Sequence, residues 1–299
     1  MSAVLYPLKF QVGVRTLFVA RRRLIRIPFS LADTMHGEMP VLPPLGDAQG
    51  YIITSLPEAL LDGLKGRGPL LHVRQRYTRY YADFARGFDA YMAGFSGKTR
   101  AALKRKLKRF AELSGGSLDI RRYRTVEEIA AFAEIAVPLS RKSYQHRLLD
   151  AGLPEDDTAR REMAALAAAD RVRAFILFRM ERPVAYLYLP AADDVLIYAH
   201  LGYDPAEAEH SPGTILQLEA TRLLAEEGRY TRLDFTEGEG QHKRQLSTGG
   251  VACADVLLLR PTVANRLLIT GLRSFDAAVA LAKRASTLRG FGWLKGLRR

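Results

Sequence analysis

The sequence has a single cysteine, Cys253, and no Cys/His spacing typical of a zinc site. One cysteine cannot form an intramolecular disulfide, so we expect a reducing compartment and no bound metal. No window holds 18 uninterrupted apolar residues, which argues against a membrane-spanning helix. The N-terminus also lacks the layout of a secretory signal peptide. These absences predict a cytoplasmic protein, either free or bound to the inner face of the membrane.

Acidic residues are scarce in three stretches of the chain, whose net charge is +13. From Val256 to the end, nine Lys/Arg residues accompany one acid, Asp276. Residues 98–110 hold seven basic residues and no acid, and residues 21–26 hold four arginines. Such clusters attract phosphates of nucleic acid, lipid or a cofactor. Each cluster is equally consistent with a solvated face of a basic protein.

The composition otherwise indicates a folded globular protein. Of its 299 residues, 48% are hydrophobic and 9% aromatic, which suits one large core or two of ordinary size. The first ~95 residues read as short strands and one helix. A basic helix is expected at about 97–113, and residues from 262 onward are expected to be mostly helical.

Residues 117–260 predict the order β-α-α-β-β-β-α-β-α-β. Thr125 and Glu128 form a capping box at the start of a helix, which Pro138 is expected to break or kink. Two strands at about 172–190 and a single third strand at 195–203 are expected to form an antiparallel meander. A helix then crosses over to the next strand, where a ligand can meet the helix N-terminus.

The sequence Ser-Pro-Gly-Thr opens this crossover helix. Ser211 is a preferred N-cap residue, and Pro212 suits the first helical position. Gly213 has no Cβ, which would let a ligand approach the backbone closely. The amides of Gly213, Thr214 and Ile215 could then bind phosphate oxygens, supported by the helix dipole. An ordinary well-capped helix would show the same pattern.

Taken with the order of elements, this helix start resembles the GNAT acyltransferase fold, and more narrowly its CelD-type or FemAB-like branch. The residues that carry the resemblance are Gly202-Tyr203-Asp204-Pro205, Ser211-Pro212-Gly213-Thr214, Asp234-Phe235-Thr236, Gly238, His242-Lys243 and the basic helix. The resemblance covers about residues 95–259 well and the first 95 residues weakly. It implies an α/β (α+β) fold: a mixed sheet flanked by helices, with a degenerate GNAT-like N-terminal half.

The implied division of the chain has four parts. They are an N-terminal degenerate GNAT-like domain at 1–95, a basic connecting helix at 96–116, a catalytic GNAT domain at 117–260, and a basic amphipathic helical tail at 261–299.

The implied chemistry is transfer of an acyl group from acyl-CoA, or another acyl thioester, to an amine that attacks the thioester directly. No permanently bound cofactor is implied. The residues assigned to the donor are Ser211, Gly213, Thr214, Ile215 and Tyr203. Those assigned to the acceptor are Tyr198, His210, Lys243 and Arg76. The candidate catalytic residues are His200, Asp234, His242 and Glu237, and His210 is a further candidate base.

Histidine suits amine deprotonation because it titrates near neutrality. His200 is the first candidate because it lies in the strand expected beside the thioester, with the same side-chain parity as Tyr198. His242 is the second, although relatives usually have tyrosine there. Asp234 could orient the acceptor, act as the base or cap the next turn. A structural role stays open for each histidine, and Cys253 is expected to be a small core residue.

The acceptor is less well specified. The tail places Phe291, Trp293 and Leu294 among basic residues, a pattern typical of a segment that lies in an anionic membrane interface. An amphiphilic amine is then a plausible acceptor. FemAB-like GNAT proteins of this size are similar to bacterial ceramide synthases, which N-acylate a sphingoid base. Amino-sugar acylation in cell-envelope assembly and aminoacyl transfer from tRNA are the enzymatic alternatives. A non-enzymatic nucleic-acid-binding protein is the alternative from another class, but we expect no nucleic-acid partner because a recognised reading motif is missing.

Overall fold

The computed structural model describes residues 3–13, 15–66, 68–143, 152–238 and 240–288. The chain folds into two compact units. Unit 1 consists of residues 1–78 and 251–299, and unit 2 consists of residues 79–250. These bounds differ from the predicted division, because the last strand pairs with the N-terminal strands rather than with those of residues 117–234.

Unit 1 contains a mixed sheet with the strand order β1-β2-β3-β11-β4. Its β1 and β2 are antiparallel, β2 and β3 are parallel, and β3 and β11 are antiparallel. Two separate apolar clusters form its core. The strands are β1 (Ala3–Val12), β2 (Arg15–Pro28), β3 (Gly50–Pro57), most of β4 (Leu70–Asp83) and β11 (Gly249–Leu259); the helices are α1 (Leu31–His36), the 3-10 helix η1 (Glu58–Leu60), α2 (Leu61–Leu64) and α10 (Val263–Leu288).

Unit 2 contains a mixed sheet with the order β4-β10-β8-β7-β6-β5, in which β9 also pairs with β7. Most pairs are antiparallel, and β8 and β10 are parallel. After the end of β4 come α3 (Phe88–Ala93), α4 (Gly97–Leu113), β5 (Asp119–Tyr123), α5 (Val126–Lys142), α7 (Asp157–Ala168), β6 (Val172–Arg179), β7 (Arg182–Ala192), β8 (Val195–Ile197), β9 (His200–Tyr203), the 3-10 helix η2 (Pro205–His210), α8 (Pro212–Glu227), β10 (Arg232–Asp234) and α9 (Gln241–Leu246). The predicted fold class, a mixed sheet flanked by helices, is confirmed.

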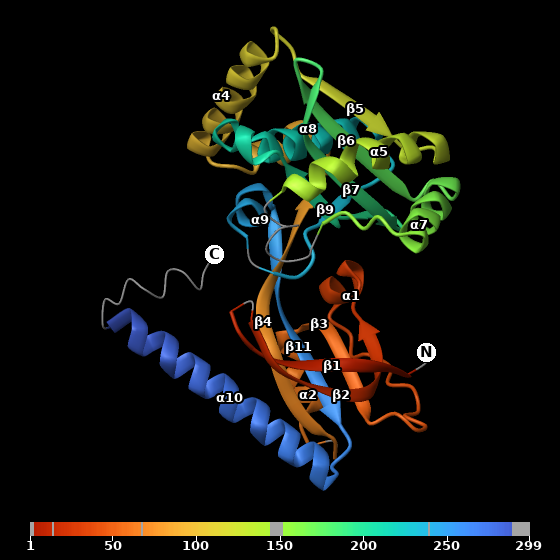
Figure 1. Cartoon of the computed structure of the whole chain (residues 1–299), viewed down its shortest axis with the longest axis vertical. Helices are drawn as coiled ribbons and strands as arrows, with labels where there is room; N and C mark the ends of the chain where they lie inside the picture. Colours follow the sequence, from red (N-terminus) through yellow and green to blue (C-terminus); the bar gives the residue numbers. More distant parts are fainter. Residues whose placement is uncertain (1–2, 14, 67, 144–151, 239, 289–299) are drawn as a thin grey trace. The chain divides into compact units, whose positions relative to one another are not determined.

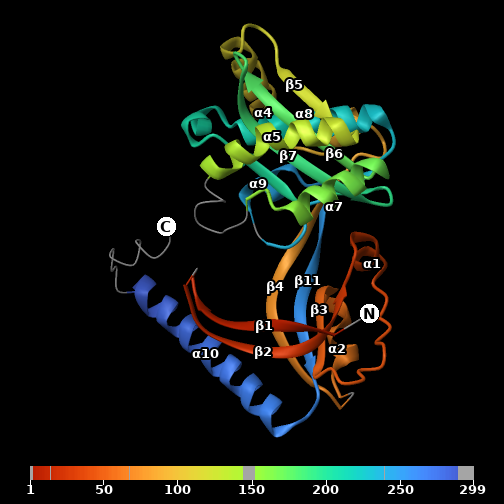
Figure 2. The same cartoon turned by 45° about the vertical axis from the view of Figure 1, so that its right-hand side comes forward.

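The sheet of unit 2 is covered on both faces (Figures 1 and 2). Along β6, Phe175 and Leu177 belong to the cluster that contains α8, whereas Ala174 and Ile176 belong to the cluster that contains α5 and α7. This alternation is that of a strand buried on both faces. Helix α8 therefore packs against one face of the sheet, and its first turn contacts that sheet.

The ends of several helices are determined by residues close to them in sequence. Ser96 caps α4, and its hydroxyl accepts a hydrogen bond from the Thr99 amide. The capping box of Thr125 and Glu128 is present at the start of α5. Gly228 ends α8 in the left-handed conformation, with φ at 68°, a conformation that costs glycine little.

Of the two outcomes expected at Pro138, a break or a kink, the break does not occur, because α5 continues to Lys142. Proline removes one backbone donor and crowds the carbonyl four residues earlier. The side chains of Phe132 and Leu139, before and after the proline, are both buried in the core. Packing on both sides of Pro138 therefore holds the helix together.

The expected single strand at 195–203 is two strands. The chain leaves the sheet at Tyr198 and Ala199, between β8 and β9. On one side β8 pairs with β10, and on the other β9 pairs with β7. Between them Ala199 belongs to neither ladder, whereas the Tyr198 amide still donates to the Asp234 carbonyl of β10.

Candidate functional site

A pocket of about 260 Å³ lies in unit 2 at the start of α8. Its walls come from the break after β8, from β9, from η2 and from the first turns of α8. The lining residues are Tyr198, Leu201, Tyr203, Ala208, Ser211, Gly213, Thr214 and Gln217. Five of these eight are residues that the sequence assigned to a site.

The break between β8 and β9 is held open by a hydrogen bond across strands. The Tyr198 amide donates to the Asp234 carbonyl of β10, at 2.9 Å. From His200 onward the chain pairs with β7 instead, with His200 opposite Tyr188. The two strands therefore diverge directly beside the pocket.

The first turn of α8 differs from the predicted cap. Ser211 adopts a left-handed conformation, with φ at 55°, and its hydroxyl does not cap the helix. Its carbonyl accepts hydrogen bonds from the amides of Thr214, at 3.1 Å, and Ile215, at 3.2 Å. Two of the three amides expected to bind phosphate are therefore already used within the turn. Among the described residues, the Gly213 amide has no such partner.

Gly213 has a packing role that the sequence did not reveal. A Cβ at this position would lie 3.0 Å from Cδ2 of Leu201 and 3.4 Å from Cδ1 of Tyr203. The glycine therefore lets the first turn of α8 approach β9 closely. A bulky residue here would disturb this packing whether or not a ligand binds.

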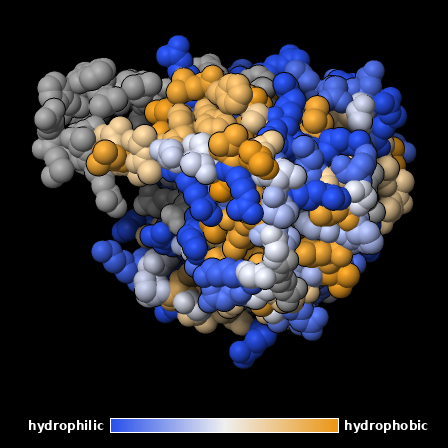
Figure 3. Space-filling model, turned by 90° about the horizontal axis from the view of Figure 1, so that it is seen from below, coloured by the Kyte–Doolittle hydropathy of each residue, from blue (hydrophilic) through white to orange (hydrophobic). Residues whose placement is uncertain are grey.

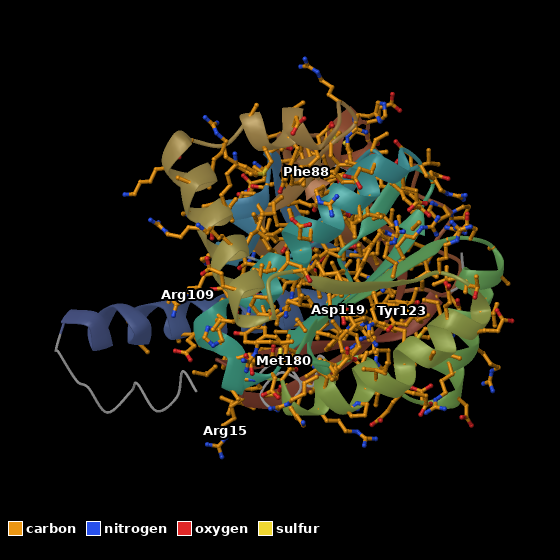
Figure 4. The ribbon with its side chains drawn as sticks, turned by 90° about the horizontal axis from the view of Figure 1, so that it is seen from above. Arg15, Phe88, Arg109, Asp119, Tyr123 and Met180 are labelled. Atoms are coloured by element: carbon orange, nitrogen blue, oxygen red, sulfur yellow. The ribbon has the colours of Figure 1, made fainter. Side chains whose placement is uncertain are left out.

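Two polar groups at this pocket were missed by the sequence reasoning. Gln217, on the next turn of α8, is 2% exposed, and within the described part of the chain its Nε2 has no hydrogen-bond partner. Lys106, on α4, donates from Nζ to the Ser211 hydroxyl, at 3.1 Å. The basic cluster at residues 98–110 had indicated the helix of Lys106 as a possible phosphate-binding segment. For Gln217, the only signal in the sequence was an amide side chain among apolar residues. Helix α4, which also carries Arg109, runs beside α8 (Figure 4).

Tyr198 is buried, and its ring packs edge-on against Phe235 with centroids 5.4 Å apart. Burial raises the pKa of its phenol well above the ordinary value of about 10. The hydroxyl therefore stays protonated at neutral pH. Tyr198 as a residue lines the pocket and is the first residue of the strand break.

His200 faces away from this pocket. Because β9 alternates, Leu201 and Tyr203 point toward α8, whereas His200 points to the α5 face. Its ring centroid lies 6.3 Å from that of Tyr188. The predicted shared parity of His200 and Tyr198 is wrong, because the strand break between them resets the alternation.

Asp234 forms a buried ion pair with Arg79. Its carboxylate accepts from Arg79 Nε at 3.1 Å and from Arg79 Nη2 at 2.5 Å, and also from the Thr236 amide at 2.8 Å. Both side chains are over 90% buried. These partners hold the Asp234 carboxylate in place. The residue is therefore better suited to positioning β10 than to accepting a proton from a substrate.

The remaining acceptor candidates lie around the end of β10 and α9. Glu237 is exposed, and its carbonyl accepts from Lys243 Nζ at 2.6 Å. Burial lowers the pKa of Lys243, and the charges of Asp234 and Glu237 partly offset this. His242 belongs to α9, but its side chain lies outside the described residues.

Two further candidates have other neighbours. His210 ends η2, with Nε2 3.4 Å from Glu209 Oε1. Its Nδ1 is buried and has no partner in the described structure. Arg76 belongs to unit 1, where its guanidinium pairs with Glu58 at 2.7 Å.

In the described ranges, no group of three or more His, Cys, Asp or Glu residues is placed to bind a metal ion. Of the helices in these ranges, none is both long enough and apolar enough to cross a bilayer.

Comparison with known proteins places the pocket inside a family domain. Residues 97–244 match the model of the acetyltransferase (GNAT) domain. FemX is a structural neighbour at 12% identity and a TM-score of 0.52, covering 87% of this chain and 89% of FemX. Another is the C-terminal domain of a protein described as a lysylphosphatidylglycerol synthetase from Agrobacterium fabrum, at 13% identity and a TM-score of 0.51, covering 81% of this chain and 73% of that domain. A search of curated proteins found no match. At these identities the two structures indicate a shared fold, which extends beyond unit 2.

Proposed function

Because this chain belongs to the GNAT superfamily through its domain at residues 97–244, we propose that it transfers an acyl group from a thioester to an amine. The observation that carries the proposal is the pocket at the start of α8, which opens beside the gap between β8 and β9. The thioester donor is acyl-CoA, bound during turnover rather than permanently.

The phosphates of the donor are assigned to the mouth of α8. There the Gly213 amide, the Lys106 ammonium and the Ser211 hydroxyl are close together. The positive end of the helix dipole supports a negative ligand at the same place. Compared with the expectation from sequence, a side-chain cation replaces the amides of Thr214 and Ile215 as the main partner of the phosphates.

Gln217 gives the pocket a second polar contact deeper along α8. Leaving a buried amide group unpaired costs about 1–3 kcal/mol. A ligand carbonyl or hydroxyl that accepts a hydrogen bond from Nε2 would remove this cost. The pantetheine arm of CoA carries such groups, and it would extend from the phosphates toward the strand break.

In the proposed reaction, the amine nitrogen attacks the thioester carbonyl carbon, so a C–N bond forms and the C–S bond breaks. The thiolate that leaves takes up a proton, and the amine nitrogen gives one up. We assign the hydrogen bond to the leaving sulfur to Tyr198, because this residue lines the pocket and its buried hydroxyl remains protonated. The gap in the sheet at Ala199, directly after the Tyr198 amide that is hydrogen-bonded to the Asp234 carbonyl, offers a place for the carbonyl oxygen of the thioester.

His200 remains our proposed base, but for a different reason. A donor that enters from the α8 face places its carbonyl at the gap in the sheet. The amine then approaches from the opposite face, where His200 lies next to Tyr188. His242 and Glu237 are the alternatives in this proposal, and Asp234 acts as a positioning residue through Arg79.

The acceptor class that we test first is a long-chain sphingoid-type amine, as in ceramide synthesis, and the second is an amino sugar. Aminoacyl-tRNA is a second candidate donor, favoured by the basic helix α4, whose Lys106 reaches the pocket mouth. A non-enzymatic nucleic-acid-binding role is the alternative from another class.

The test combines acyl-CoAs of increasing chain length with these amines and uses mass spectrometry to detect the amide product. We expect one donor–acceptor pair to give an amide and an equal amount of free CoA thiol. His200→Ala should lower this turnover by ~10²-fold if His200 is the base. Product formed only with aminoacyl-tRNA would select the second donor. RNA binding without turnover of any donor would overturn the proposal.

A further inference from the structure

The net charge of the chain is concentrated in unit 1. Residues 1–78 and 251–299 contain nineteen Lys/Arg and seven Asp/Glu residues, a net +12 of the total +13. Unit 2, with the GNAT pocket, has 26 basic and 25 acidic residues. The excess positive charge therefore belongs to the part of the chain that the proposed chemistry uses least.

Exposed hydrophobic residues are also concentrated in unit 1. Ten of the thirteen large hydrophobic residues exposed at the described surface lie in unit 1. They are Val4, Leu5, Val12, Leu17, Phe18, Met35, Val41, Val263, Leu267 and Leu281. Figure 3 shows hydrophobic side chains (orange) at the surface among hydrophilic ones (blue). Single exposed apolar residues are common, but a cluster of them in a strongly basic unit indicates an interaction surface.

Several of these residues lie together at the end of the β1–β2 hairpin. Leu17 and Phe18, each 61% exposed, follow the turn, and Val12 precedes it. Within unit 1, β1 contacts α10 (Figures 1 and 2). Phe10 of β1 joins the two elements, with its ring 5.5 Å from that of Phe18 and 5.4 Å from that of Phe275 on α10.

Helix α10 continues this surface. Phe275 faces the hairpin, and the next turns carry exposed Ala277, Ala278 and Leu281, the last 69% exposed. Its inward stripe, with Ile269 and Leu272, packs on the sheet of unit 1. The outward side of the helix therefore carries apolar side chains together with charged ones such as Arg273 and Asp276.

The charges of the hairpin itself are all of one sign. Residues 1–32 contain six Lys/Arg and no Asp or Glu. Lys9, Arg15 and Arg21 are exposed on β1 and β2, and Arg15 extends away from the ribbon in Figure 4. On α10 the exposed acid Asp276 lies next to Phe275. Exposed apolar side chains with mostly basic neighbours match the two layers of an anionic bilayer surface, its headgroups and its acyl chains.

We propose that the tip of the β1–β2 hairpin and the outer face of α10 form a docking surface for an anionic lipid bilayer. Leu17, Phe18 and Leu281 enter the interface, while Lys9 and Arg15 contact lipid phosphates. Nucleic acid fits less well, because among the large hydrophobic residues exposed at the described surface only Phe18 could stack on a base, and leucines give neither phosphate contacts nor base stacking. This surface differs from the terminal segment predicted from sequence, since residues 289–299 lie outside the described structure.

The test is sedimentation of the full-length protein with vesicles of phosphatidylcholine alone or mixed with phosphatidylglycerol. We expect binding to the anionic vesicles only. Leu17→Ser should weaken it about tenfold, since most of a leucine side chain leaves water on insertion. Met180→Ser is the matched control, because Met180 is 69% exposed but lies in unit 2. It should bind like the wild type.

A charge variant separates lipid from nucleic acid. Arg15→Glu should reduce vesicle binding, whereas Arg182→Glu, at an exposed position in unit 2, should not. Equal binding to neutral and anionic vesicles, or no effect of Leu17→Ser, would overturn the proposal. So would RNA binding that Arg15→Glu abolishes while vesicles are not bound. Thermal melting of each variant checks that the hairpin remains folded.

Discussion

At the residue scale, the start of α8 shows how one side chain changes the chemistry of a helix terminus. Ser211 has the residue type of a helix cap, but its hydroxyl accepts from Lys106 instead of from the helix. The α8 mouth therefore carries a full positive charge in addition to the partial charge of the helix dipole. A diphosphate bound here would interact with that ammonium.

Replacing this lysine should therefore weaken donor binding. We expect Lys106→Ala to raise the Kd for CoA by roughly tenfold, as expected for loss of a charge-assisted hydrogen bond. Isothermal titration calorimetry measures this directly. Lys108→Ala is the control, because Lys108 is exposed on the same helix and removes the same charge. Equal losses in the two variants would mean that α4 acts only through its overall charge.

At the scale of elements, α10 is held to β4 beside a buried histidine. His72 of β4 is 5% exposed, and its Nε2 lies 3.9 Å from Asp276 of α10. Burial lowers the pKa of His72, as does Arg74, and Arg273 adds to this while Asp276 opposes it. The neutral imidazole is therefore favoured in the folded state.

This shift predicts how stability depends on pH. Below the ordinary histidine pKa of about 6.5, the unfolded state binds a proton that the folded state resists. The free energy of unfolding should therefore fall as the pH drops from about 6.5 through the lowered pKa of His72. Melting temperatures between neutral and mildly acidic pH should fall less steeply in His72→Gln than in the wild type. His36→Gln, at an exposed position on α1, is the matched histidine control; identical slopes for His72→Gln and the wild type would contradict the assignment.

At the scale of the whole molecule, unit 2 is one continuous segment placed between the two parts of unit 1. Two apolar clusters lie entirely within residues 79–250, and the other two lie entirely in unit 1. Strands β4 and β11, which enter and leave unit 2, are neighbours in the sheet. Each unit therefore has its own core, and the pocket is built from unit 2 alone.

The segment 79–250 should accordingly fold by itself and bind CoA with a Kd within about threefold of the full chain, a difference below 1 kcal/mol. Circular dichroism and calorimetry on the excised segment test this. The same segment should not bind anionic vesicles, because the proposed docking surface is missing. A folded segment without CoA affinity would show that unit 1 contributes to the donor site.

Local signals along the chain were enough to place several elements. The caps of α4 and α5 and the glycine that ends α8 depend on residues within one turn, so they can be predicted without tertiary contacts. The motifs within 202–214 contain four of the eight pocket residues, Tyr203, Ser211, Gly213 and Thr214. The family itself follows from these motifs and their order.

Only the tertiary structure decided where the side chains of the site point. The break at Tyr198 and Ala199 arises because β8 pairs with β10 while β9 pairs with β7, strands distant in sequence. That break turned His200 to the opposite face, and Lys106 came to Ser211 from another helix. Likewise, the packing role of Gly213 comes from its closeness to Leu201, and the positioning role of Asp234 comes from its ion pair with Arg79. Helix caps are set by neighbours in sequence, whereas strand pairing and charge pairing join residues that only folding brings together.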